Sequence, residues 1–146
     1  GGYGVVILEG DSRRELSAGF ELTTNNRMEI LAAIKALESL PARSDVTLFT
    51  DSRYLADAIN LGWAKRWKAN RWKRNRREKA MNIDLWKKLL PLCEKHNVSF
   101  KWVKAHAGNT HNERCDVLAK QAAKGKNLQI DRGYLSSSRD SQASMF

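Results

Sequence analysis

At 146 residues, the chain has the length of one globular domain. Its apolar content of 42% argues against wholesale disorder, and no apolar run approaches the roughly 20 residues that cross a bilayer. With 26 Lys and Arg against 16 Asp and Glu, the formal charge of +10 favours nucleic acid or another polyanion as partner. Cys93 and Cys115 form no disulfide framework or metal-binding spacing, so we expect a reducing, cytoplasmic setting.

The first part of the chain predicts a β-hairpin, a helix, a strand and a second helix. Residues 3–8 and 14–22 have strand patterns and are joined by the turn residues 9–12. Residues 24–40 form the clearest helical pattern, with Thr24 or Asn25 as its cap. Residues 46–50 predict a buried strand, and residues 52–61 predict an amphipathic helix.

The second part continues the alternation of helices and strands. Residues 82–96 predict a helix in which Pro91 should cause a kink or delay the start. A strand over 98–104 and a helix over 112–124 follow, which makes an α/β domain with a mixed sheet. We therefore expect a domain over 1–132 with a basic protrusion at about 63–80. The composition of 133–146 predicts a disordered tail.

Glu29 lies at the rim of the apolar arc of the helix predicted over 24–40. At 100° per residue, that arc contains Ile30, Ala33, Ile34, Leu37 and Leu40, whereas Arg27 falls on the opposite, polar side. A carboxylate that leans toward a core must be paired, protonated or bound to metal. The alternative is that Glu29 complements the helix dipole in the first turn.

Asp51 and Asp116 are the other two candidate carboxylates. Asp51 follows a buried strand, and ligands of open α/β sheets bind at the carboxyl ends of strands. Asp116 lies early in its helix, opposite nothing obviously basic. The alternatives are an N-cap for Asp51 and a helix-dipole role for Asp116.

His106 lies in a loop after the last predicted strand, where an imidazole could transfer protons. A lone His is more often a satisfied surface or core residue. Together with the three carboxylates it supplies the parts of an oxygen-ligand site, which hard Mg²⁺ or Mn²⁺ prefers.

Four blocks of sequence resemble the bacterial type I ribonuclease H family. They are TTNNRMEI at 23–30, TDSRYL at 50–55, NIDLW at 82–86 and HAGNTHNERCDVLA at 106–119. They occur in family order with similar spacing and span nearly the whole chain up to the tail. The resemblance implies a ribonuclease H-like five-stranded mixed sheet flanked by helices.

The resemblance also implies an activity, a cofactor and a partner. The RNA strand of an RNA–DNA hybrid would be cleaved by two-metal-ion hydrolysis, with two Mg²⁺ ions and Mn²⁺ as the alternative. Glu29, Asp51 and Asp116 match three of the four metal-binding carboxylates of the family, and His106 matches its mobile histidine. No membrane and no obligate protein partner is expected, and the chain should be a monomer.

Further matches predict a nucleic-acid interface. Asn25 and Asn26 match residues that contact the hybrid's minor groove, where the 2′-hydroxyl distinguishes RNA from DNA. Thr24 and Asn82 match positions that hold a DNA-strand phosphate. The alternative for Asn25 and Asn26 is helix capping.

The basic protrusion resembles the family's handle along the DNA strand, and its aromatic and cationic residues alternate. At least one of its tryptophans should anchor the handle to the core instead. Arg53 stands where many relatives have Gln, which favours a phosphate contact, and Ala105 replaces a Gly and stiffens the histidine loop. The binding candidates in and near the protrusion are Arg53, Trp63, Lys65, Arg66, Trp67, Lys68, Arg71, Trp72 and Lys73.

The sequence begins with Gly1-Gly2-Tyr3-Gly4, which resembles the end of the Gly-rich turn that follows the family's first strand. The resemblance implies that this central strand and the catalytic Asp on it are absent. We therefore expect the 146 residues alone to be unstable and nearly inactive. Two other interpretations remain, a non-catalytic hybrid- or duplex-binding module and a domain of a larger element such as a reverse transcriptase. The basic protrusion favours a stand-alone enzyme over the latter.

Overall fold

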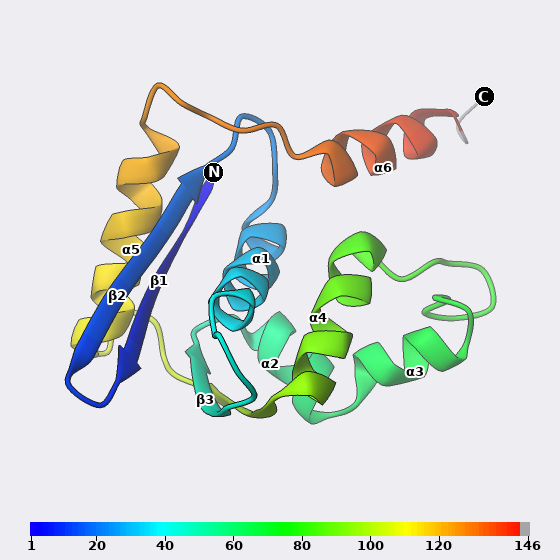
Figure 1. The fold of residues 1–146 in the computed structure, drawn as a ribbon. Coiled ribbons are helices and arrows are strands. Elements are labelled where there is room, and N and C mark those ends of the chain that lie inside the picture. The colour runs from blue at the N-terminus through cyan, green and yellow to red at the C-terminus, as the bar shows by residue number, and fades with distance from the viewer. Residues whose placement is uncertain (144–146) are drawn as a thin grey trace.

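The structure is a computed structural model that describes residues 1–143. Within that part, the strands are β1 (Gly2–Glu9), β2 (Ser12–Gly19), β3 (Asp45–Thr50) and β4 (Asn97–Trp102). The helices are α1 (Asn25–Glu38), α2 (Arg53–Asn60), α3 (Trp63–Ala69), α4 (Ile83–Lys95), α5 (Thr110–Ala123) and α6 (Arg132–Ala143). The predicted mixed α/β class is confirmed (Figure 1).

The antiparallel hairpin of β1 and β2 lies between α1 and α5 (Figure 1). Its two-residue turn begins at Gly10, whose φ of 55° suits a tight hairpin turn. Successive side chains of β1 alternate between faces. Tyr3 and Val5 pack toward α1, while a Cβ added at Gly4 would collide with the carbonyl oxygen of Cys115 in α5. Glycine therefore allows α5 to approach the hairpin closely.

The main core forms on the other side of α1. Strands β3 and β4 pair in parallel, and their apolar residues pack with α1, α2 and α4. The largest fully buried side chains in this core are Trp86, Ile30, Ile34, Leu37, Leu55 and Leu89. Because Met28 of α1 packs with the hairpin while Ile30 and Ile34 pack in the main core, α1 joins the two halves.

A groove of about 710 Å³ separates the two sheets. It is lined by β1, β3, α1 and α5. Among the described residues, β1 pairs only with β2 and β3 only with β4, so each strand has one edge without a strand partner. A single five-stranded sheet is therefore not present in residues 1–143. The expectation that the family's central strand is absent stays a prediction.

Most predicted elements are confirmed within a few residues, but the C-terminal expectation is wrong. Residues 132–143 form α6 where a disordered tail was predicted, and the remaining residues 144–146 lie outside the described part. Asp131 initiates this helix, because its carboxylate accepts a hydrogen bond from the Tyr134 N–H at 3.2 Å. Helix α4 begins at Ile83, so Pro91 does not delay its start.

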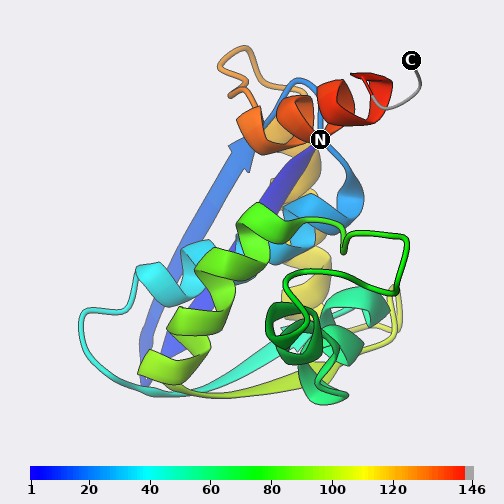
Figure 2. The same cartoon turned by 90° about the vertical axis from the view of Figure 1, so that its right-hand side faces the viewer.

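The basic segment contains a helix that the sequence did not predict, α3. This segment lies on the side of the molecule away from the hairpin (Figures 1 and 2). No helix in residues 1–143 is long and apolar enough to cross a membrane.

Candidate active site and nucleic-acid interface

Three structural elements bring the predicted carboxylates to one groove. Glu29 extends from α1, Asp51 follows β3 directly, and Asp116 lies in α5, and all three line the groove between the sheets. Burial raises the pKa of Glu29 to about 7, and the negative charges of Asp51 and Asp116 add to the shift. Glu29 is therefore close enough to Asp51 and Asp116 for both of their negative charges to act on it.

Three neighbouring side chains contact Asp51 or Asp116. The Asn112 amide donates to an Asp51 carboxylate oxygen at 3.4 Å, and the Trp102 indole donates to the Asp51 backbone carbonyl at 3.1 Å. Lys120 pairs with Asp116 at 2.9 Å, one helical turn along α5. The expectation that Asp116 faces nothing basic is therefore wrong.

The donor chemistry of the groove fits a hard divalent cation. Carboxylate oxygens are the ligands that Mg²⁺ and Mn²⁺ prefer, and a cation would favour the charged form of Glu29, which burial and the charges of Asp51 and Asp116 disfavour. Within residues 1–143, no three His, Cys, Asp or Glu side chains already form a compact ligand cluster. The carboxylates thus share a groove without closing around a common point.

His106 is not brought into this groove. It is exposed in the loop between β4 and α5, and its backbone adopts the left-handed conformation with φ of 58°. Among the described residues, those of this region that line the groove are Asn109, His111 and Asn112. The Asn109 carboxamide oxygen accepts from the Asn112 N–H at 3.0 Å and caps α5. The cap fixes the point at which the loop ends and the helix begins.

The predicted substrate contacts of α1 lie at its exposed first turn. Thr24, Asn25 and Asn26 are all exposed, and the Thr24 hydroxyl oxygen accepts from the Arg27 N–H at 3.2 Å as the N-cap. Asn82 precedes α4, half-buried and with a φ of 60°. Its carboxamide lies between Arg27 and the Tyr54 hydroxyl.

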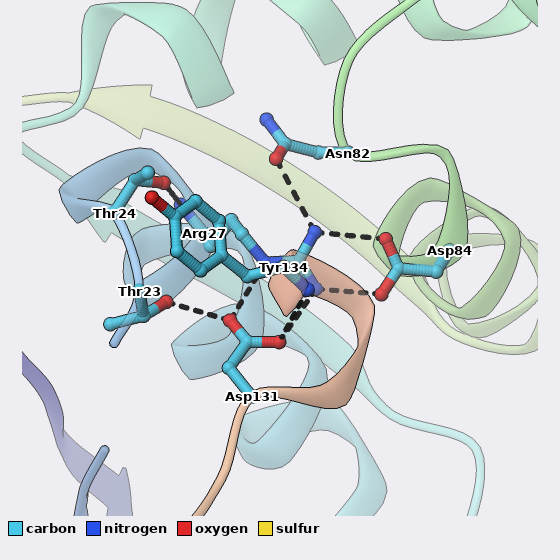
Figure 3. A network of polar contacts seen from close by, with 7 residues as sticks. All are labelled: Thr23, Thr24, Arg27, Asn82, Asp84, Asp131 and Tyr134. Carbon is cyan, nitrogen blue, oxygen red and sulfur yellow. Dashed lines mark hydrogen bonds and ion pairs between the residues drawn. The ribbon is translucent and has the colours of Figure 1, made fainter. Parts of the chain in front are cut away.

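Arg27 links α1 to α4 and to the segment before α6 (Figure 3). Its side chain is only 4% exposed, so its expected place on the polar side of the helix is wrong. The guanidinium donates two bonds to Asp131, at 2.7 and 2.9 Å, and two to Asp84, at 2.9 and 2.6 Å. Burial alone would raise the pKa of Asp84 and of Asp131, but the hydrogen bonds and charge of Arg27 lower both below their ordinary value.

The basic segment divides its residue types between core and solvent. Trp67 packs edge-on against the buried Trp86, with ring centroids 6.0 Å apart. Trp63 packs against Trp67 in turn, with ring centroids 6.5 Å apart. Trp72 is also partly buried against the core. The exposed cations of the segment include Lys65, Arg66, Lys68, Arg71 and Lys73. Its tryptophans thus anchor the segment, and its cations face solvent.

Arg53 lies near Asp51 and stacks on an aromatic ring. Its guanidinium carbon is 4.1 Å from the centroid of the Trp102 ring, a cation–π contact. The same indole donates to the Asp51 backbone, so Arg53 is held beside the carboxylate groove.

The family model for RNase H matches residues 1–124. The chain belongs to the RNase H family. It is 63% identical over 134 residues to the Ribonuclease H of Syntrophus aciditrophicus (strain SB), a match that covers 92% of this chain and 78% of the relative. It is 62% identical over 135 residues to the Ribonuclease HI of Synechocystis sp. (strain ATCC 27184 / PCC 6803 / Kazusa), where the match covers 92% and 84%.

Solved structures agree with this family assignment. LC9-RNase H1, described as a type 1 RNase H with the type 2 active-site motif, superposes with a TM-score of 0.73 at 31% identity. The match covers 86% of this chain and 63% of that longer chain. The foamy viral protease–reverse transcriptase, at 18% identity and a TM-score of 0.67, shares the fold alone.

The chain is therefore a hydrolase of the ribonuclease H type, which acts on RNA–DNA hybrids. Proteins of this family generally depend on divalent metal.

We predict that Glu29→Gln stabilises the metal-free protein at pH 8 and not at pH 4. The folded-state pKa of about 7 exceeds the ordinary 4.5, so the stability linked to protonated Glu29 is complete below 4.5 and lost as pH rises through 7. Glutamine stays neutral and should gain on the order of 3 kcal/mol over the wild type at pH 8. Urea unfolding with a chelator at both pH values measures this difference.

The exposed Glu113→Gln variant is the matched control. Its free energy of unfolding should differ from that of the wild type by the same small amount at both pH values. An equal effect of Glu29→Gln on the free energy of unfolding at pH 4 and pH 8 would contradict the raised pKa of Glu29 in its buried place beside Asp51 and Asp116.

Proposed function

We propose that this chain hydrolyses the RNA strand of RNA–DNA hybrids, with Glu29, Asp51 and Asp116 as ligands of two divalent cations, Mg²⁺ or Mn²⁺. The observation that carries the proposal is that these three carboxylates, from three separate elements, line one groove. The identity of 63% to a named Ribonuclease H supports the substrate class.

Bound divalent cations would supply an activated water and stabilise the charge of the leaving 3′ oxygen. Side chains around the groove hold the proposed ligands in position. Asn112 orients the Asp51 carboxylate, and Lys120 holds Asp116 within α5. Burial of Glu29 against the core limits the motion of this one ligand, and Asp51 and Asp116 would close toward it when the cations bind.

His106 is the proposed proton carrier. It lies on an exposed loop outside the groove, so it would act by reaching toward the reacting phosphate once the hybrid is bound. The left-handed backbone at His106 restricts the directions from which the imidazole can approach.

Two surfaces are proposed to bind the hybrid. Asn25 and Asn26 would contact its minor groove, and Thr24 and Asn82 a phosphate of the DNA strand. The exposed cations of the basic segment would lie along that strand, with Trp63, Trp67 and Trp72 holding the segment in place. Arg53, stacked on Trp102, would contact a phosphate near the scissile bond.

We predict that Asp51→Asn abolishes metal-dependent cleavage of a labelled hybrid while largely sparing hybrid binding. Asparagine keeps the shape of the side chain but removes the anionic charge that a divalent cation needs. Cleavage is measured with Mg²⁺, and binding by anisotropy with Ca²⁺, with duplex DNA and duplex RNA as competing substrates. Asp11→Asn, an exposed change in the hairpin turn, is the control and should leave both unchanged.

Equal loss of cleavage and binding in Asp51→Asn would assign Asp51 a structural role. A folded wild-type chain that binds the hybrid but leaves it intact with Mg²⁺ or Mn²⁺ would favour a binding module.

We also predict that replacing Lys65, Arg66 and Lys68 by Gln weakens binding of hybrids of every sequence to a similar degree. The slope of the logarithm of affinity against the logarithm of salt concentration should fall by about one for each phosphate that is no longer neutralised. A triple change of the exposed Lys87, Lys88 and Lys95 on α4 removes equal charge from another surface. If both triples lower the slope equally, net charge accounts for binding and the basic segment has no specific role.

A further inference from the structure

Arg27 cannot itself be a ligand for the hybrid, because its guanidinium has no free donor. A guanidinium has five N–H groups. Four of them donate to Asp84 and Asp131, and the fifth donates to the Asn82 carboxamide oxygen at 3.4 Å. The side chain is buried as well, so its influence on a bound polyanion must pass through its neighbours.

The contact with Asn82 determines which way that carboxamide faces. Arg27 can only donate, so the oxygen of Asn82 must face the guanidinium. Figure 3 shows this arrangement, with the Asn82 nitrogen on the side away from Arg27. One N–H of that nitrogen donates to the Tyr54 hydroxyl at 3.3 Å, and the other is left for an acceptor outside the network.

Thr24, at the exposed start of the same helix, has a comparable arrangement. Its hydroxyl oxygen accepts from the Arg27 backbone N–H, so the O–H itself remains able to donate. Two neutral donors are therefore held around Arg27, one at the start of α1 and one at the start of α4. A phosphodiester, which only accepts hydrogen bonds, is the chemical class that suits such donors.

We propose that Arg27 is a positioning residue for this phosphate-binding pair, and that the segment before and at the start of α6 holds Arg27 in place. The inference rests on the proposed function and adds a residue and a distant segment to it. Without Arg27, the Asn82 carboxamide could rotate and present its oxygen to the phosphate, an acceptor facing an acceptor. The Asp84 carboxylate, 46% exposed, would also lose the positive charge that neutralises it beside the same site.

The C-terminal segment contributes through Asp131 and Gly133. Asp131 is 9% exposed and binds Arg27 with both oxygens, while Thr23 donates to it at 2.7 Å. Gly133 leaves room for the network, since a Cβ at this position would collide with the Asp84 carboxylate and the Arg27 guanidinium. The segment that the sequence predicted to be disordered thus reaches back to the start of α1.

The test is a double-mutant cycle of Arg27→Lys and Asn82→Ala, with hybrid affinity measured by anisotropy in Ca²⁺. Lysine keeps the charge but lacks the planar set of donors. Each single change should weaken binding roughly tenfold, and the double variant should bind no more weakly than Asn82→Ala alone. Arg114→Lys, which disrupts a two-bond pair with Glu15 elsewhere, is the matched control and should bind as the wild type does.

A second readout separates positioning from general loss of structure. In a set of hybrids, each with one DNA phosphate made neutral by a methylphosphonate, one position should weaken wild-type binding. A methylphosphonate at that same position should not weaken binding further in the Asn82→Ala or Arg27→Lys variant. Gly133→Ala should behave as Arg27→Lys does, whereas Gly125→Ala, where an added Cβ would lie 3.3 Å from its nearest neighbour, should not. If Arg27→Lys does not fold, Asp131→Asn serves in its place, because it keeps the Arg27–Asp84 pair.

Additive losses in the cycle, or a methylphosphonate effect that persists in Arg27→Lys, would overturn the inference and leave the proposed function intact. A folded wild-type chain that does not bind the hybrid would defeat the proposed function and, with it, this inference.

Discussion

The burial of Glu29 beside the negative charges of Asp51 and Asp116 is the constraint on which the candidate site depends. Three carboxylates from α1, the end of β3 and α5 line one groove, and Glu29 has its pKa raised to about 7 by burial and by its two neighbours. Lys120 forms an ion pair with Asp116. Placing a buried carboxylate beside two others costs folding free energy, which the packing of the two cores offsets. The arrangement makes chemical sense when a divalent cation compensates the charge.

Helix α1 makes this possible because it belongs to both halves of the molecule. Met28 packs with the hairpin, Ile30 and Ile34 pack in the main core, and Glu29 lies between them in sequence. The exposed Thr24 caps the same helix, and Arg27 lies in its first turn. The carboxylate groove and the proposed phosphate site are therefore fixed to one rigid element. In the proposed function, binding of the hybrid and placement of its scissile bond would be coupled through that helix.

Local sequence signals predicted most elements of the fold and the candidate carboxylates. The features that they missed depend on contacts between residues far apart in the sequence. The turn residues 9–12 between two strand patterns indicated the hairpin, the Thr24 cap indicated α1, and the motif blocks indicated the three carboxylates. The burial of Arg27 could not be predicted from helical periodicity, because its partners lie 57 and 104 residues away in sequence. The same pairing explains the error at the C-terminus. The Ser-rich composition of 133–143 indicates disorder, but Asp131 is held by Arg27 and caps the helix that follows.

The most direct test of the metal-site account is a titration of the chain with Mg²⁺, followed through the side-chain carboxyl ¹³C signals. If the groove binds the two cations, the signals of Glu29, Asp51 and Asp116 should all shift and saturate with Mg²⁺, and Glu29 should lose its proton at a lower pH when the cations are bound. Exposed carboxylates such as Glu113 should move little. If the three signals moved no more than that of Glu113, the groove would not be a metal site.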